Sequence, residues 1–373
     1  MNKAAKIILW VVIAVIIIAG IWYGVSKEQV EEKVFKIGAI VPLSVSGANM
    51  GQPLVNGMDL AISEINEKAG INGYKLKLYA EDNQFSGEKS VSAVNFLLNT
   101  INPDIYVSLF ALPTNSISPV LREAKKPLIY EAYSRTALKD NLYAFKANFD
   151  SETGCEKLVR YLKGNKKYKK LGVIFSKSDY NEECLMGIKS IEPDVKEYWY
   201  VFGEKDFKTI FGKAKNDEVD RLITIGIEFE FVNMFKQLTE LGYDISMACA
   251  TASECITPKV KEVANKELLE KTISIDFIDV NIDETVFAEK YSNEHPNASF
   301  IDLAYGAIGY EEVMYISKAM ESCEPGESAC LIESLKNVKD YNTILGSNGF
   351  KDRVLQLSVK LYQYENGNWQ VIE

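Results

Sequence analysis

The sequence is poor in the residues that carry most catalytic and metal chemistry. Its single histidine, His295, lies in a loop-like stretch before Pro296, so histidine triads and histidine-rich metal sites have almost nothing to draw on. No CxxC spacing occurs, nor does a phosphate-binding loop, a nucleophile elbow or an HExxH motif. Adjacent acids such as Glu81 and Asp82 would point to opposite faces of a strand. We therefore expect no catalytic residues, no metal, no cofactor and no enzyme activity.

Positive charge is also in short supply. The chain has 42 Lys and Arg residues against 52 Asp and Glu residues, which gives a net charge of -10. Such a surface repels polyphosphate, and no stripe of basic residues with interleaved aromatics reverses the charge locally. We expect no nucleic-acid partner. With 373 residues, 47% hydrophobic and 25% charged, the chain is long enough for two globular domains.

Charge is missing altogether from residues 7–25, an apolar run close to the ~20 residues that cross a bilayer. Lys3 and Lys6 precede this run, and basic residues stay in the cytoplasm, so the body is exported. The run is longer than the core of a cleaved signal peptide and lacks a good cleavage site. We therefore predict that residues 1–33 form a membrane anchor and tether that holds the body at the extracytoplasmic face of the cell membrane. The alternative is a cleaved signal segment that leaves the body periplasmic or extracellular.

The six cysteines all follow this segment, in a compartment where disulfides persist. Two pairs flank short, turn-rich stretches, and the third pair follows by elimination. The predicted bridges are Cys249 with Cys255, Cys323 with Cys330, and Cys155 with Cys184. A zinc site is the competing interpretation, which the absence of CxxC spacing disfavours.

Strand-like and helix-like segments alternate along the body. The β-branched apolar run 34–41 is followed by a helix from Pro53 with apolar residues at the spacing of one helix face. The alternation continues to residue 130, restarts after Asn148 and runs to residue 241. Such βαβ units form a parallel sheet with helices on both faces. We therefore predict two doubly wound α/β lobes.

In sheets of this kind, ligands bind beyond the carboxyl ends of the strands. This rule selects candidate ligand-binding residues without any alignment. In the first lobe they are Ser44, Phe110, Ala111, Leu112, Ala132, Tyr133, Ser134 and Arg135, and in the second lobe Tyr180, Glu228 and Glu254.

The start of the body carries many specific residues at fixed spacing. Residues 37–44 read Ile-Gly-Ala-Ile-Val-Pro-Leu-Ser, residues 56–66 read Asn-Gly-Met-Asp-Leu-Ala-Ile-Ser-Glu-Ile-Asn, and 70–76 read Gly-Ile-Asn-Gly-Tyr-Lys-Leu. This text resembles the opening of the branched-chain amino acid binding proteins, and weaker similarity extends over 34–373. The resemblance implies a type I periplasmic binding fold, in which three chain crossings form a hinge that permits closure. It places the first lobe at 34–147 and 279–344, and the second at 148–278 and 345–373.

The candidate site departs from this family. Members that bind amino acids offer a serine pair after the third strand and a hydroxyl after the fourth for the ligand carboxylate, and an acid in the second lobe for the ammonium. Here residues 108–112 read Ser-Leu-Phe-Ala-Leu, without the paired hydroxyls, whereas Ser134 is kept and Arg135 is added. Glu228 or Glu254 could supply the acid. The aromatic residues Phe110, Tyr133 and Tyr180 predict a more aromatic pocket.

We hypothesise that Arg135 replaces the serine pair as the carboxylate anchor, because its planar fork can bind both oxygens. The competing interpretation is that Arg135 is a solvated loop residue paired with Asp140 or Glu131. Together these features predict a solute-binding protein that captures a small polar solute, an amino acid or a related carboxylate or amide, in a cleft between the lobes. It would deliver the solute to the permease subunits of an ABC importer. The alternative is a sensing ectodomain that signals to a partner membrane protein, because one fold serves both roles.

Overall fold

A computed structural model defines the architecture. It describes residues 3, 10, 12–16, 33–45, 47–165, 167–279, 281–339 and 343–372. Among these residues, no helix combines the length and apolar character that a membrane crossing needs. Apart from Trp10 and the helical residues 12–16, the predicted anchor at 7–25 lies outside the described residues.

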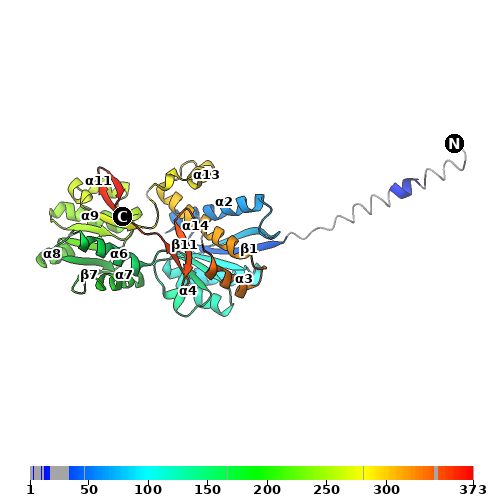
Figure 1. Ribbon diagram of the computed structural model, residues 1–373, viewed down its shortest axis with the longest axis horizontal. Helices are drawn as coiled ribbons and strands as arrows, with labels where there is room; N and C mark the ends of the chain where they lie inside the picture. Colours follow the sequence, from blue (N-terminus) through cyan, green and yellow to red (C-terminus); the bar gives the residue numbers. More distant parts are fainter. Residues whose placement is uncertain are drawn as a thin grey trace.

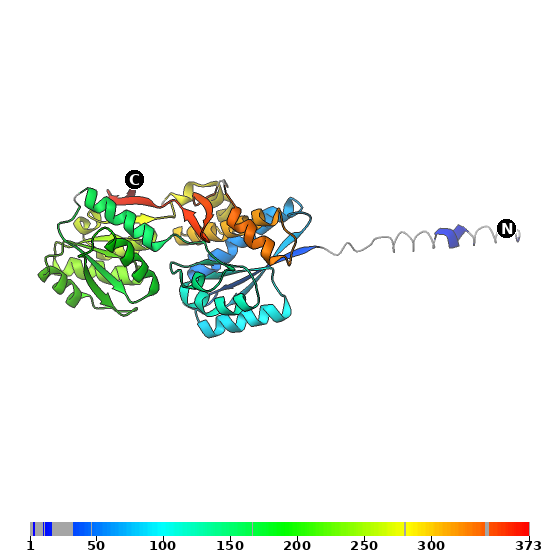
Figure 2. The same cartoon turned by 60° about the horizontal axis from the view of Figure 1, so that its bottom comes forward.

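Two lobes lie side by side, as Figure 1 and Figure 2 show. The first lobe combines the blue and cyan start of the body with the orange part of the chain. Its sheet has the order β11-β12-β5-β4-β3-β1-β2. The strands of this sheet are β1 (Val34–Val41), β2 (Lys75–Asp82), β3 (Ile105–Leu109), β4 (Leu128–Glu131), β5 (Ala144–Lys146), β11 (Ser347–Lys351) and β12 (Val354–Leu357).

The second lobe is built from the green and yellow middle of the chain, closed by the red C-terminal strands. Its sheet has the order β14-β13-β10-β9-β8-β6-β7. The strands of this sheet are β6 (Leu171–Ser176), β7 (Lys196–Tyr200), β8 (Arg221–Thr224), β9 (Ser246–Cys249), β10 (Ile273–Asp276), β13 (Lys360–Glu365) and β14 (Asn368–Val371).

Helices connect the strands of each lobe. Those of the first lobe are α2 (Ala48–Glu67), α3 (Gly87–Thr100), α4 (Ala111–Glu123), α5 (Thr136–Lys139), η1 (Ile282–Glu284), α13 (Val286–Glu294), α14 (Phe300–Met320) and α15 (Ser328–Asn337). Those of the second lobe are α6 (Ser151–Gly164), α7 (Asp179–Lys189), α8 (Lys208–Asn216), α9 (Glu228–Leu241), α10 (Ala252–Cys255), α11 (Pro258–Val263) and α12 (Lys266–Glu270).

The prediction of two α/β lobes is confirmed, with one refinement. The central strands of each sheet are parallel, but β11 runs antiparallel to β12, and β13 runs antiparallel to both β10 and β14. Both sheets are therefore mixed, because each ends in an antiparallel hairpin.

The assignment of residues 345–373 to the second lobe is wrong for the first part of that range. Val354 of β12 pairs in parallel with Lys146 of β5, and Phe350 of β11 packs edge-to-face on Phe145 with ring centroids 5.3 Å apart. These contacts attach β11 and β12 to the first sheet, and only β13 and β14 join the second. The third passage between the sheets thus lies between Leu357 and Lys360 rather than at the predicted boundary between residues 344 and 345.

The long helix α14 packs closely on α2 in the first lobe. A Cβ atom on Gly57 would lie 1.8 Å from the carbonyl oxygen of Gly306, and one on Gly309 would lie 2.0 Å from that of Leu54. Only glycine permits this backbone approach. The close packing fixes the position of α14 beside the sheet, and with it the polar side chains that α14 carries.

Candidate functional site

The residues selected by the strand-end rule form two groups in the first lobe. One group lies after β1 and β3 and contains Ser44 and Phe110. The other follows β4 and contains Tyr133, Ser134 and Arg135, of which Tyr133 and Arg135 reach the second lobe. Two surface hollows, one along α6 and one beside β7 and α8, contain none of the predicted site residues.

Asp82 organises the first group from the end of β2. Its carboxylate accepts the backbone N–H of Leu43 at 2.9 Å and that of Ser44 at 3.4 Å, and it also accepts the Ser44 hydroxyl. Burial pushes the pKa of Asp82 upward, but the hydrogen bonds from Ser44, Leu43 and Gln84 outweigh burial and lower it. The Ser44 hydroxyl is therefore committed to shaping this loop.

Phe110 has a backbone conformation that is rare outside glycine, with φ 71° and ψ 150°. Its ring packs edge-to-face on Phe85 with centroids 5.0 Å apart. Such backbone strain costs about 1–3 kcal/mol and concentrates at functional sites. Ala111 and Leu112 form the first turn of α4. Pro113 is tolerated beside them because it lies in the same first turn.

Ala132 and Ser134 are both buried after β4. The Ser134 hydroxyl donates to the Thr136 hydroxyl at 3.0 Å and accepts the Thr136 backbone N–H at 3.0 Å. This hydroxyl therefore closes a local turn into α5, in the pattern that serine commonly uses at turns.

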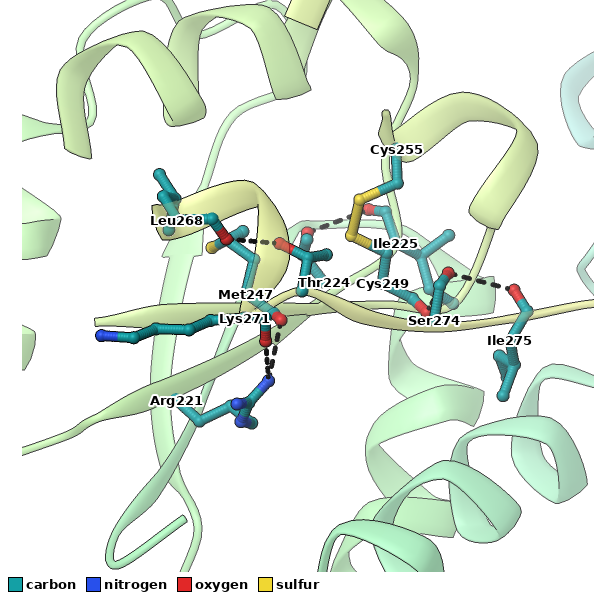
Figure 3. The surroundings of a disulfide bond; sticks show 11 residues. Arg221, Thr224, Ile225, Met247, Cys249, Cys255, Leu268, Lys271, Ser274 and Ile275 are labelled. Atoms are coloured by element: carbon teal, nitrogen blue, oxygen red, sulfur yellow. Dashed lines mark hydrogen bonds between the residues drawn. A yellow bond between two sulfur atoms is a disulfide. The ribbon is translucent and has the colours of Figure 1, made fainter. Parts of the chain in front are cut away.

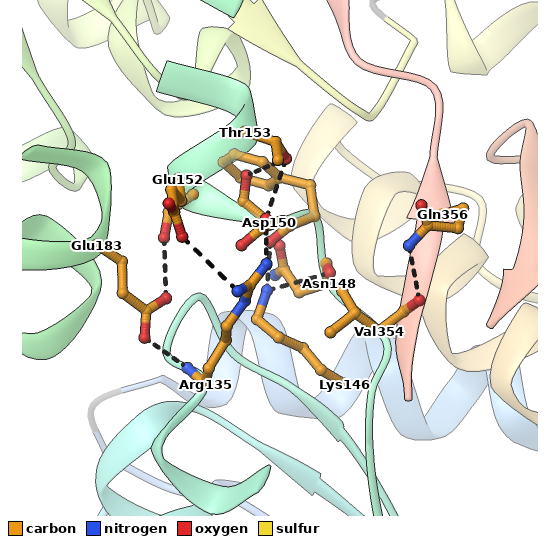
Figure 4. A network of polar contacts seen from close by, with 11 residues as sticks. Arg135, Lys146, Asn148, Asp150, Glu152, Thr153, Glu183, Val354 and Gln356 are labelled. Carbon is orange, nitrogen blue, oxygen red and sulfur yellow. Dashed lines mark hydrogen bonds and ion pairs between the residues drawn. The ribbon is translucent and has the colours of Figure 1, made fainter. Parts of the chain in front are cut away.

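Arg135 bridges the two lobes (Figure 4). Its guanidinium pairs with Asp150 and, at 3.7 Å, with Glu152 at the start of α6. Its backbone N–H donates to Glu183 of α7 at 2.9 Å. The predicted pairing of Arg135 with Asp140 or Glu131 is thus wrong, because the chain after β4 turns Arg135 toward the second lobe. A role as carboxylate anchor stays a prediction, and it would require Arg135 to leave Asp150.

Lys146, the last residue of β5, lies in the same network. Its buried ammonium donates to the carbonyl oxygen of Asn148 at 3.1 Å and to that of Phe149. Burial lowers the pKa of Lys146, while Asp150, Glu131 and Glu183 oppose this shift. Arg135 and Lys146 are therefore both engaged by groups of the protein itself.

In the second lobe, a disulfide shapes the segment that carries Glu254 (Figure 3). Cys249 ends β9 and Cys255 ends α10, with their Cα atoms 6.2 Å apart. Ser274 of β10 donates to the carbonyl oxygen of Cys249 at 2.8 Å and ties the segment to the sheet. Glu254 is buried there and accepts the backbone N–H of Glu228 at 3.1 Å.

The two acids predicted for the second lobe differ in their surroundings. The Glu228 carboxylate pairs with Lys259 at 2.5 Å, and although burial acts in the opposite direction, this contact helps to lower its pKa. Burial raises the pKa of Glu254 to about 7, with Glu228 and Asp276 adding to the shift. Glu254 is therefore the acid whose charge is less compensated.

All three predicted disulfides are confirmed. Besides Cys249–Cys255, the bridge Cys155–Cys184 joins α6 to α7 with Cα atoms 5.3 Å apart, and Cys323–Cys330 spans 5.8 Å. These separations are ordinary for disulfides. The six cysteines are all used, which leaves none for the competing zinc site.

Aromatic rings meet where the lobes touch. Tyr133 of the first lobe packs against Tyr180 of the second with centroids 5.7 Å apart, and against Phe149 at 5.2 Å. Phe149 in turn contacts Phe277 at 5.6 Å. We call the contact region around Tyr133, Arg135, Tyr180 and Glu183 the interlobe junction.

Four residues near this junction were not predicted: Glu131, Asp276, Tyr305 and Glu312. Glu131 ends β4 and Asp276 ends β10, so the strand-end rule could have found both. Tyr305 and Glu312 are seven residues apart on α14, about two turns, and so share a face. The sequence feature that could have indicated them is a pair of acids, Glu311 and Glu312, within a largely apolar helix.

Tyr133 and Tyr305 face these carboxylates together. Burial raises the pKa of both hydroxyls well above the usual value, and Glu254, Asp276 and Glu131 raise it further. Both rings nevertheless keep part of their surface accessible to solvent. This combination is typical of side chains that line a concave site rather than a closed core.

Comparison with known proteins agrees with this geometry. The sequence profile of the periplasmic binding proteins matches residues 34–368. The chain belongs to this family. Within it, the chain resembles the branched-chain amino acid type: a Leu/Ile/Val-binding protein of Citrobacter freundii is 23% identical over 286 residues, which cover 74% of this chain and 77% of that protein. These relatives are solute-binding proteins and not enzymes, and membership of the family implies an extracytoplasmic location.

Solved structures share the fold. A branched-chain amino acid transporter substrate binding protein of Streptococcus pneumoniae, in complex with isoleucine, has a TM-score of 0.75 at 20% identity, over 91% of this chain and 99% of its own. A solute binding protein of an ABC transporter from R. palustris, in complex with 4-hydroxybenzoate, has a TM-score of 0.77 at 16% identity, over 91% and 96%. This binding protein therefore shares its two-lobed architecture with proteins whose ligands differ in chemistry.

Proposed function

We propose that this binding protein captures a small solute between its two lobes at the outer face of the cell membrane and delivers it to an ABC importer. Residues 7–25 would anchor it there. Transport is supported by the relatives, two of which are named as parts of transporters.

The observation that carries the proposal is the direct contact between the lobes beyond the carboxyl ends of β4 and β6. Tyr133 and Arg135 follow β4, and they meet Tyr180 and Glu183 of α7, the helix that follows β6. In open α/β sheets this end of the strands is where ligands bind. A solute held there would contact both lobes at once, so binding would favour closure.

The hinge supports the same mechanism. The chain passes between the sheets after β5, after β10 and after β12. A few residues at such passages can absorb the rotation of one lobe against the other, because each lobe has its own sheet and covering helices. We propose that residues 146–150, 276–279, 281–282 and 357–360 belong to this hinge, with the domain boundaries moved accordingly.

The proposal is tested by screening the full chain, in detergent, against amino acids, small amides, amines and aromatic acids by thermal shift and then calorimetry. A solute that binds and stimulates the ATPase activity of the importer only in the presence of this chain would support it. Binding that leaves an importer unaffected but changes the output of a partner membrane receptor would favour sensing and contradict delivery.

A further inference from the structure

The interlobe junction holds three buried carboxyl groups. Glu131 comes from β4, Asp276 from β10 and Glu254 from α10, and each is less than a tenth exposed. All three carboxyl groups raise the pKa of the Tyr133 and Tyr305 hydroxyls, so all three lie near these two rings. We call these three residues the acidic cluster.

A second observation concerns a buried acid without hydrogen bonds, Glu312 of α14, among the described residues. Glu312 is only 2% exposed, and neither of its carboxylate oxygens has a hydrogen-bond partner among the described residues. It lies beside Glu131, whose Oε2 atom likewise has no partner in the described part of the chain, although its other oxygen accepts the Asn148 side chain. Buried acids are normally paired or hydrogen-bonded, because an uncompensated one is costly.

The protein's own cations compensate these acids only in part. Arg135 is held by Asp150 and Glu152. Lys146 donates to two backbone carbonyl oxygens and faces Asp150, Glu131 and Glu183, so that its single positive charge is shared among three carboxylates. A ligand carboxylate placed at the acidic cluster would therefore meet an excess of negative charge.

We propose that the solute is a small organic cation, an amine with an apolar body and no carboxylate, whose charged group lies between Glu254, Glu131 and the rings of Tyr133 and Tyr305. The carboxylates supply the counter-charge, and the tyrosine faces supply cation–π attraction, which is stronger away from water. The remaining rings of the junction, Tyr180 among them, would cover the apolar body. The inference rests on the proposed function and specifies its ligand.

The test uses matched ligands that share one body and differ only in charge. Phenylethylamine, phenylalanine and phenylpropanoate form one series, and isopentylamine, leucine and isohexanoate form the other. Calorimetry with the full chain in detergent should show that an amine binds at least about tenfold more tightly than the amino acid of the same body, because the added carboxylate faces the acidic cluster. The simple carboxylates should not bind.

Two variants locate the site. Glu254→Gln should weaken binding of the amine by about tenfold or more, because it removes a charge from the contact and keeps the shape. Glu311→Gln is the matched control: Glu311 is also buried, but it accepts the Leu345 backbone N–H at 2.7 Å. That variant should bind the amine within about twofold of the parent chain.

Amine binding that Glu254→Gln leaves unchanged would overturn the proposed location. If leucine, phenylalanine or a carboxylate binds and the amines do not, the cation inference is overturned while solute capture stands. If no compound of either series binds, and the wider screen of solutes is also negative, both the inference and the proposed function fail.

Discussion

Arg135 offers the sharpest test of how the lobes are held together. In the structure its guanidinium crosses from the first lobe to Asp150 at the start of α6. This contact joins the two lobes. Replacing Arg135 by alanine should therefore shift the protein toward open forms. Solute binding should weaken, because a smaller fraction of the protein is then in the closed form that binds the ligand.

The size of the effect follows from burial. The Arg135 side chain is 38% exposed and that of Asp150 is 10% exposed. Breaking a fully buried pair costs about 3–5 kcal/mol, whereas an exposed pair contributes about 0–1. Between these limits we expect about 1–2 kcal/mol, or about a 5-fold to 30-fold loss of affinity.

A double-mutant cycle separates this account from the carboxylate-anchor hypothesis. Calorimetry on the parent chain, Arg135→Ala, Asp150→Asn and the double variant would use isopentylamine or leucine, whichever binds the parent. If the pair matters through lobe contact, the double variant should bind about as weakly as either single variant, because each removes the same interaction. Additive losses would refute the pair, and a loss caused by Arg135→Ala alone would instead support direct ligand contact.

Three further predictions can be checked on the purified protein. Reducing agent should lower the melting temperature, since each bridge contributes roughly 2–4 kcal/mol, and a non-reduced digest should contain the three observed pairs; free thiols in exported protein would contradict this. A chain that begins at residue 34 should be recovered without detergent, because both lobes have their own cores, and recovery only in detergent would argue against the tether. Glu254 faces Glu228, Asp276, Tyr133 and Tyr305, and its pKa is raised to about 7. Amine affinity should therefore rise between pH 6 and 8, because Glu254 attracts a cation only when it is ionised. A flat calorimetric profile would show that Glu254 does not contact the cation.

The lobes could be predicted because their strands and helices alternate with distinct periods. Apolar residues repeat along one face of α2 and fill β1 almost continuously, and such local patterns survive folding. The closing hairpins could not be assigned to a sheet. The hairpin of β11 and β12 turns at Asp352 and Arg353, both with positive φ, and nothing in its local pattern says whether it adds to β5 or to β10. That choice depends on long-range pairing.

The site residues likewise divide into those that the sequence could predict and those that it could not. Tyr133, Tyr180 and Glu254 follow strands in the sequence, so a general rule on sheet edges found them. Tyr305 and Glu312 lie on α14, far along the chain from β4, and the close packing of α14 on α2 helps to place them near Glu131. The partner of Arg135 was also out of reach, because it belongs to the other lobe.

The central claim is that a solute binds between the lobes and draws them together. Because the six native cysteines are all paired, added thiols at two exposed positions, Phe96→Cys on α3 and Phe202→Cys after β7, can carry a fluorescent donor and acceptor. Single-molecule energy transfer across the lobes, with and without a saturating amount of the bound amine, would measure their separation directly. We predict that the ligand shifts a broad distribution to a single narrow one. A ligand that binds by calorimetry while the distribution stays unchanged would contradict capture between the lobes.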